Sequence, residues 1–199
     1  FSPTKAGIDK ELIQTLAKGC IEYQSKAVAG SSFFLGLPGG WTIAMAVPTD
    51  IAQFYHNAII LIQKLMYLYD WPQLTDGENN IDDNTKLVIT LFLGVMLGAA
   101  GAVQALDLLG KAVAEETAKR VAALPLTKYS FYNIIKQIAK WIGVSLTKRS
   151  FAQIVSKIVP IVSGLISASI SYGLLKAMGK KLKKHLEDNP PSTGLVKVG

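Results

Sequence analysis

Apolar residues recur along most of the chain at intervals of three and four, the spacing that predicts α-helices. Residues 9–28 show this spacing as one stripe, formed by Leu12, Ile13, Leu16, Cys20 and Ile21. Residues 42–69 are apolar on most sides, which is typical of a helix that is buried or in lipid. No segment alternates with period two over the length of a strand. The pattern therefore predicts an all-α protein, a compact bundle of about six to eight helices.

Glycine and proline mark the ends of these helical segments. The segment 30–41 contains four glycines and one proline and predicts a break after the first helix. Pro48 predicts the start of the second helix or a kink in it. The polar, acidic segment 70–83 predicts a surface loop. We expect a single domain over residues 1–188, followed by a flexible tail over residues 189–199.

Two runs of residues carry no charge at all. Residues 87–103 have Thr90 as their only polar side chain, and residues 158–175 form the second run. A transmembrane helix needs about 20 apolar residues, with about 17 near the lower limit, so both runs are borderline. Small residues recur in them about one turn apart and predict close helix–helix packing. These residues are Gly94, Gly98, Gly101, Gly164, Ala168 and Ser171. The bundle is thus expected to contain two long apolar helices rich in small residues.

Charge is distributed unevenly between the two ends of the chain. Residues 1–127 hold nine basic and twelve acidic residues, a net charge of −3, whereas residues 128–199 hold twelve basic and two acidic residues, a net charge of +10. Together they give the total of +7. A basic half on an apolar protein indicates an anionic partner, either a membrane surface or nucleic acid.

Five lysines follow the second apolar run, and we expect them to contact a membrane surface: Lys176, Lys180, Lys181, Lys183 and Lys184. The alternative is a solvated helix end whose lysines favour the C-terminal dipole. Nucleic acid is not favoured, because the aromatic residues among the lysines of 128–157 fall at the helical spacing of core residues.

Residues able to carry out catalysis or bind metal are sparse. Cys20 is the only cysteine, and the only two histidines, His56 and His185, are far apart in the sequence, so a zinc site is not favoured. The glycines of segment 36–41 are not followed by the lysine of a phosphate-binding loop. We interpret His56 as a core histidine and His185 as a solvated helix cap. The sequence therefore predicts a non-enzymatic protein without catalytic residues, metal or cofactor.

Several small motifs occur in an order that resembles the EcsC family. They contain Gly36, Pro38, Gly39, Gly40, Pro48, Asp50, Tyr69, Pro160 and Gly164. The resemblance implies an all-helical protein, often linked by context to secretion machinery and membranes, with no established activity. The chain departs from the family pattern where a Tyr-Gly pair is expected, because Tyr69 is followed by Asp70. It departs again where more glycine and an asparagine are expected, at Ala168, Ser171 and Tyr172.

These features favour a cytoplasmic protein that associates peripherally with membranes by binding lipid or an anionic surface, with a protein partner at the membrane as a further option. In this role it would support secretion or another membrane process. Two alternatives stay open. One is a pore-forming or inserting protein, stored in soluble form with both apolar runs hidden, which resembles pore-forming colicin domains in architecture. The other is a purely structural or protein-interaction domain whose glycines pack a helical core.

Overall fold

The computed structural model describes residues 3, 6–36, 43–74, 83–115, 126–145, 166–189 and 191. They form six α-helices and one 3-10 turn, and no strand occurs among them, which confirms the all-α prediction. The elements are α1 (Lys10–Gly36), α2 (Ile43–Leu68), α3 (Asp83–Leu97), α4 (Ala102–Glu115), η2 (Leu126–Lys128), α5 (Tyr132–Ser145) and α7 (Ile166–Asp188).

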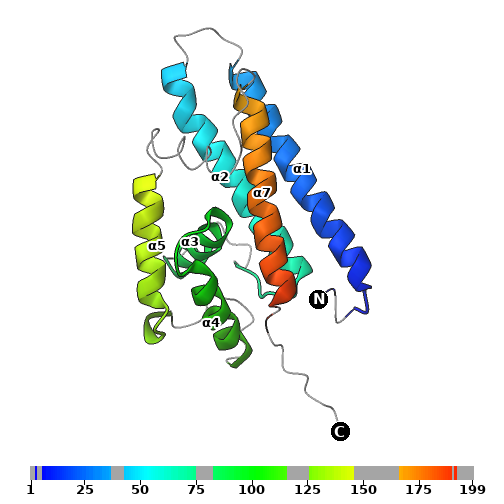
Figure 1. Ribbon diagram of the computed structural model, residues 1–199, viewed down its shortest axis with the longest axis vertical. Helices are drawn as coiled ribbons and strands as arrows, with labels where there is room; N and C mark the ends of the chain where they lie inside the picture. Colours follow the sequence, from blue (N-terminus) through cyan, green and yellow to red (C-terminus); the bar gives the residue numbers. More distant parts are fainter. Residues whose placement is uncertain are drawn as a thin grey trace.

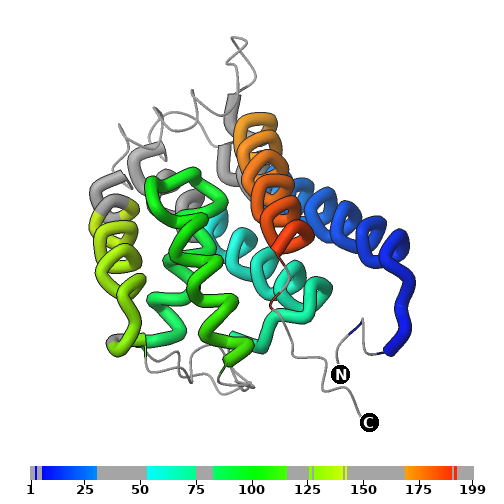
Figure 2. Tube along the Cα trace, turned by 60° about the horizontal axis from the view of Figure 1, so that its bottom comes forward, coloured from blue at the N-terminus to red at the C-terminus, as the bar shows by residue number. Residues whose placement is uncertain are grey.

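The helices fall into two groups that share one hydrophobic core. Helices α1, α2 and α7 lie side by side, and α7 runs antiparallel to α1 along most of its length (Figure 1). Helices α3, α4 and α5 form the second group, with α5 on the side of the molecule away from α1 (Figure 2). The two groups meet where α3 contacts α2 and α7. Fully buried side chains of these three helices include Leu61 and Leu65 on α2, Phe92 on α3, and Leu174 and Leu175 on α7.

Gly179 lets three helices approach one another closely. A Cβ on this residue would lie 2.8 Å from Leu61 Cδ2 on α2 and 3.1 Å from Ile21 Cγ1 on α1. Gly94 has the same role in the second group, because its Cβ would lie 2.7 Å from Ile138 Cγ2 on α5. The structure thus places Gly94 in a tight helix–helix contact, as expected, and adds Gly179, which the spacing of small residues did not single out.

The apolar run 87–103 is not one long helix. Helix α3 ends at Leu97, where the Gly98 amide donates to the Val95 carbonyl and the Ala99 amide donates to the Gly94 carbonyl. This pair of bonds is a Schellman motif, which requires a left-handed residue after the helix. Gly98 supplies it with φ of +81°, and Gly101 turns the chain into α4 with φ of +76°.

Two predictions about this run are therefore wrong. The long apolar helix is divided by a tight turn, and Gly98 shapes that turn as a left-handed residue. Gly101 is also left-handed, but it does lie in a close contact, because a Cβ on it would be 3.1 Å from Ile134 Cγ2 on α5. Gly98 is exposed and lies beside the side chain of Lys181. A Cβ on Gly98 would be 2.6 Å from Lys181 Nζ. The periodicity was compatible with both roles, since small residues one turn apart occur at helix contacts and also at helix ends.

Much of the second apolar run lies outside the described residues. Helix α7 begins at Ile166, so Gly164 and Pro160 are not described, and Ala168 lies in the first turn of the helix. Ser171 is half-buried on α7. Within the described ranges, no helix combines the length and the apolarity needed to cross a membrane.

The first two helices differ from the prediction at their ends. Helix α1 continues through Gly30 to Gly36, so the break expected at Gly30 comes later, and α2 contains Pro48 and Asp50 inside the helix. Pro38, Gly39 and Gly40 lie outside the described residues. Helix α2 ends in a second Schellman motif, with the Trp71 amide donating to the Met66 carbonyl at 2.9 Å.

Candidate anion-binding groove

Helix α1 keeps large apolar side chains on its outer side. Ile13, Ala17 and Ile21 are buried, whereas Leu12 is 51% and Leu16 44% exposed. The residues of the predicted stripe are therefore divided, with Ile13 and Ile21 buried and Leu12 and Leu16 exposed. Leu12 and Leu16 share the outer side with Gly19 and Tyr23, since these positions are three to four residues, or about one turn, apart.

The inner flank of α1 meets α7 at a groove of about 460 Å³. We call it the lysine groove. It is lined by Lys18, Ile21 and Glu22 from α1 and by Lys176, Lys180, Lys183 and Lys184 from α7. Four of the five lysines expected at a membrane surface are thus gathered in one place. Lys181 is not among them, because its ammonium lies at the Gly98 turn beside the end of α3.

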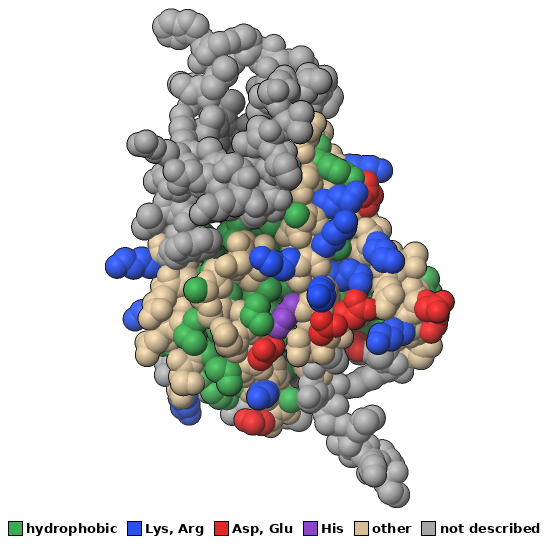
Figure 3. All heavy atoms as spheres, in the orientation of Figure 1, with side chains coloured by type: hydrophobic (Ala, Val, Ile, Leu, Met, Phe, Trp, Pro, Cys, Tyr) green, Lys and Arg blue, Asp and Glu red, His purple; other side chains and the backbone are tan. Residues whose placement is uncertain are grey.

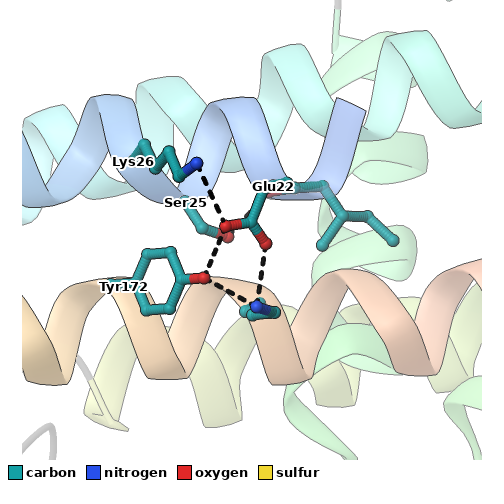
Figure 4. A network of polar contacts seen from close by, with 6 residues as sticks. Glu22, Ser25, Lys26 and Tyr172 are labelled. Carbon is teal, nitrogen blue, oxygen red and sulfur yellow. Dashed lines mark hydrogen bonds and ion pairs between the residues drawn. The ribbon is translucent and has the colours of Figure 1, made fainter. Parts of the chain in front are cut away.

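One end of the lysine groove is held by a polar network across the two helices (Figure 4). The Tyr172 hydroxyl donates to Glu22 Oε1 at 2.7 Å, and the Lys176 ammonium donates to the Tyr172 hydroxyl oxygen at 2.6 Å. Lys176 Nζ also lies 2.8 Å from Glu22 Oε2, and Lys26 Nζ lies 3.5 Å from Glu22 Oε1. Glu22 is therefore surrounded by donors.

These donors keep Glu22 ionised. The hydrogen bond from Lys176 and then that from Tyr172 lower the pKa of Glu22 from 4.5 to about 2. In return, the hydrogen bonds to Glu22 and Tyr172 raise the pKa of Lys176. At neutral pH Glu22 is negatively charged and Lys176 is positively charged, so the two charges cancel each other.

A second ion pair lies about two turns further along α7. Lys183 Nζ is 2.6 Å from Glu187 Oε2, and the Gln14 amide donates to the other oxygen of Glu187. Lys183 lowers the pKa of Glu187 through this hydrogen bond. Burial is the largest single influence on Lys183 and lowers its pKa, but Glu187 and Tyr69 together outweigh burial and raise the pKa of Lys183.

Three lysines of the groove remain without such compensation. Lys18, Lys180 and Lys184 are exposed, and none of them has an ion-pair partner among the residues that the structure describes. Figure 3 shows basic side chains gathered over α7 and α1 on the face seen there. The groove therefore carries a local positive charge next to the exposed apolar side of α1.

The two histidines occupy positions opposite to those expected. His56 is exposed on α2 and is not a core residue. His185 is half-buried, with Nε2 3.1 Å from Asp107 Oδ1 on α4, so it links two helices and is not a solvated cap. Asp107 also lines a groove of about 450 Å³ together with Trp71, Gly110 and Lys111. Throughout the described ranges, no three His, Cys, Asp or Glu side chains come together as metal ligands.

Comparison with known proteins gives no match: no protein-family model, curated protein or solved structure is similar to this chain. The resemblance to the EcsC family therefore stays a prediction. Of its motif residues, Tyr69 is half-buried beside the core, and burial raises the pKa of its hydroxyl. Tyr172, which departs from the family pattern, is the residue that bonds Glu22 across the α1–α7 contact.

The sequence missed the contribution of α1 to the groove. In the sequence, Lys18 and Glu22 are simply charged residues that lie largely outside the apolar stripe of residues 9–28. The spacing of residues along one helix cannot show which of its flanks will face another helix. The Tyr172–Glu22 hydrogen bond joins α1 to a helix some 150 residues later in the chain. The excess of lysines on α7 is the one signal that could have indicated this contribution, because these lysines need acidic partners from another helix.

Proposed function

We propose that this protein associates peripherally with anionic membrane surfaces, through the lysine groove and the outer side of α1. The observation that carries the proposal is the adjacency of two features on one helix. Lys18 lies on the flank of α1 toward α7, and Leu12 and Leu16 are exposed on its outer side. An apolar side flanked by basic residues is the pattern of a helix that lies in a membrane interface.

The two features contribute in different ways. Each basic residue near an anionic leaflet contributes about 1 kcal/mol, and salt screens this attraction over a Debye length of roughly 8–10 Å. Exposed leucines contribute by burial of apolar area at about 25 cal/mol per Å², which salt hardly affects. Binding should therefore have a salt-sensitive part from the lysines and a salt-insensitive part from α1.

Co-sedimentation with vesicles tests the proposal. We expect the full chain to bind vesicles that contain phosphatidylglycerol, more strongly at low than at physiological salt, and to bind neutral phosphatidylcholine vesicles weakly. The double variant Leu12→Gln, Leu16→Gln should lose on the order of 1–3 kcal/mol of binding free energy at both salt concentrations. Equal binding to neutral and anionic vesicles, or no binding to either, would refute the proposal.

Release of a dye trapped in the vesicles distinguishes this proposal from membrane insertion. A protein that stays at the interface should leave the dye inside at protein concentrations that saturate binding. Leakage in proportion to bound protein would favour the inserting alternative instead.

A further inference from the structure

The charges of the lysine groove are not equivalent, and the difference indicates a ligand. Lys176 is paired with Glu22, and Lys183 is paired with Glu187. Lys18, Lys180 and Lys184 stay uncompensated among the described residues and line the same groove. Lys180 and Lys184 are one turn apart on α7, and Lys18 approaches from α1. Three lysines from two helices, none with an acidic partner among the described residues, therefore line one concave site.

Such a set fits a phosphomonoester better than other biological anions. A phosphomonoester carries about −1.5 to −2 charges at pH 7 and three acceptor oxygens. Each lysine ammonium offers three donors and no acceptor. A phosphodiester or a carboxylate has one charge and two such oxygens, so it leaves part of the groove's charge uncompensated. The groove's volume of about 460 Å³ also lies in the ordinary range for small-molecule sites, about 300–1,000 Å³.

We infer that the groove between α1 and α7 binds the phosphomonoester headgroup of a membrane lipid, with Lys18, Lys180 and Lys184 as its ligands. The inference rests on the proposed membrane association. The exposed Leu12 and Leu16 on the same helix favour a lipid over a soluble phosphate ester, because they give the lipid's acyl region an apolar neighbour.

Glu22 limits the affinity of this site. Its carboxylate stays ionised at physiological pH and is paired with Lys176, which also lines the groove. A bound phosphate is repelled by this carboxylate and cannot use Lys176 fully. Replacement of Glu22 by glutamine should therefore strengthen binding.

The test compares vesicles of phosphatidylcholine that contain either phosphatidic acid, a phosphomonoester, or phosphatidylglycerol, a phosphodiester, at equal surface charge. We expect the wild-type protein to bind the monoester vesicles about fivefold more tightly, the effect of about one additional charge contact. The variant Lys18→Gln, Lys180→Gln, Lys184→Gln should bind the two kinds of vesicle equally. The matched variant Lys128→Gln, Lys136→Gln, Lys140→Gln, which alters exposed lysines of η2 and α5, should keep the preference.

Two further measurements make the result independent of folding defects. The variant Glu22→Gln should bind the monoester vesicles several-fold more tightly, which a misfolded protein would not do. Acidification from about pH 7.5 to pH 5 should weaken the preference, because the monoester takes up its second proton near pH 6.

The outcomes separate this inference from the proposed function. Equal binding to both kinds of vesicle, with anionic binding intact, would overturn the headgroup assignment alone. Absence of binding to either would overturn both. Equal affinity for soluble glycerol 3-phosphate and for the lipid would overturn the membrane source of the ligand.

Discussion

Helices α1 and α7 meet in a different way from helices α3 and α5. The α3–α5 contact is closed by apolar side chains, with Ile138 over the backbone of Gly94 and with Ile135 buried on the same helix. The α1–α7 contact has an equally tight centre at Gly179, but its edge consists of lysines, carboxylates and a tyrosine hydroxyl. One contact serves packing alone, and the other combines packing with an exposed charged groove.

The difference shows where a membrane-binding surface can be sought in an apolar chain. The most apolar run of the sequence, residues 87–103, is buried almost throughout α3 and turns back at Gly98. Three of the large apolar side chains that are exposed, Leu12, Leu16 and Tyr23, belong to α1, whose composition is more polar, and the others include Tyr67 on α2 and Val103 and Leu108 on α4. Apolarity that is hidden in the core is a property of folding, and exposed apolarity next to uncompensated charge is what a membrane surface can use.

The largest expected effect comes from overfilling the centre of either contact. Gly179→Leu and Gly94→Leu should each lower the free energy of unfolding by about 1–3 kcal/mol, because their side chains would collide with Leu61 or Ile138. Gly19→Ala is the control: nothing lies within 4 Å of its Cβ, and it should stabilise α1 by roughly 0.5–1 kcal/mol. Urea unfolding measures all three. Wild-type stability of Gly179→Leu would show that the α1–α7 contact is looser than the structure has it.

The turn between α3 and α4 should be the next most sensitive point. Gly98→Ala places a Cβ on a residue with φ of +81°, which should cost about 1–2 kcal/mol. The neighbouring Lys181 ammonium is the end of a flexible side chain and can move away, so backbone strain is the main cause. Urea unfolding of the two single variants Gly98→Ala and Lys181→Ala separates backbone strain from the loss of the Lys181 contact. A neutral Gly98→Ala would mean that α3 continues past Leu97 as one apolar helix.

Asp70 gives a smaller effect of the same kind. It is the only described residue other than glycine with a positive φ, at 60°, and it stands where the EcsC resemblance expects glycine. Asp70→Gly and Asp70→Ala both remove the carboxylate, but glycine alone accepts this conformation without strain. We expect the glycine variant to be more stable than the alanine variant by about 1 kcal/mol in thermal unfolding. Equal stability of the two would remove the conformational reason for a glycine at this position.

The acid side of the stability profile tests the charged edge of the α1–α7 contact. Because the pKa of Glu22 is about 2 in the fold, below its ordinary value of 4.5, its contribution is present above pH 4.5 and is lost as the pH falls toward 2. Glu187, whose pKa is also lowered, acts in the same direction. The urea midpoint of Glu22→Gln should therefore fall less over this range than that of the wild type. The control Glu115→Gln removes an exposed carboxylate on α4, and its urea midpoint should fall with pH as steeply as that of the wild type. An equally steep fall for Glu22→Gln would show that the Glu22 network does not stabilise the fold.

The sequence predicted those features that depend on neighbours along one helix. Helical spacing placed Lys176, Lys180, Lys183 and Lys184 on one side of α7, and the structure gathers them in one groove. It failed where the answer depends on another helix. Leu12 and Leu16 are adjacent to Ile13 and Ala17, so the apolar pattern of α1 allows either pair to face the core. The structure buries Ile13 and Ala17, but the small side chain of Ala17 makes this orientation hard to predict from hydrophobicity.

The most direct test of membrane association compares two variants with the same loss of charge. The groove variant Lys18→Gln, Lys180→Gln, Lys184→Gln and the α5-side variant Lys128→Gln, Lys136→Gln, Lys140→Gln each remove three positive charges from exposed positions. Their binding free energies to phosphatidylglycerol vesicles at low salt should differ, with a loss on the order of 2–3 kcal/mol for the groove variant and little loss for the other. Equal losses would show that the protein responds to net charge alone and that the α1–α7 groove has no special role.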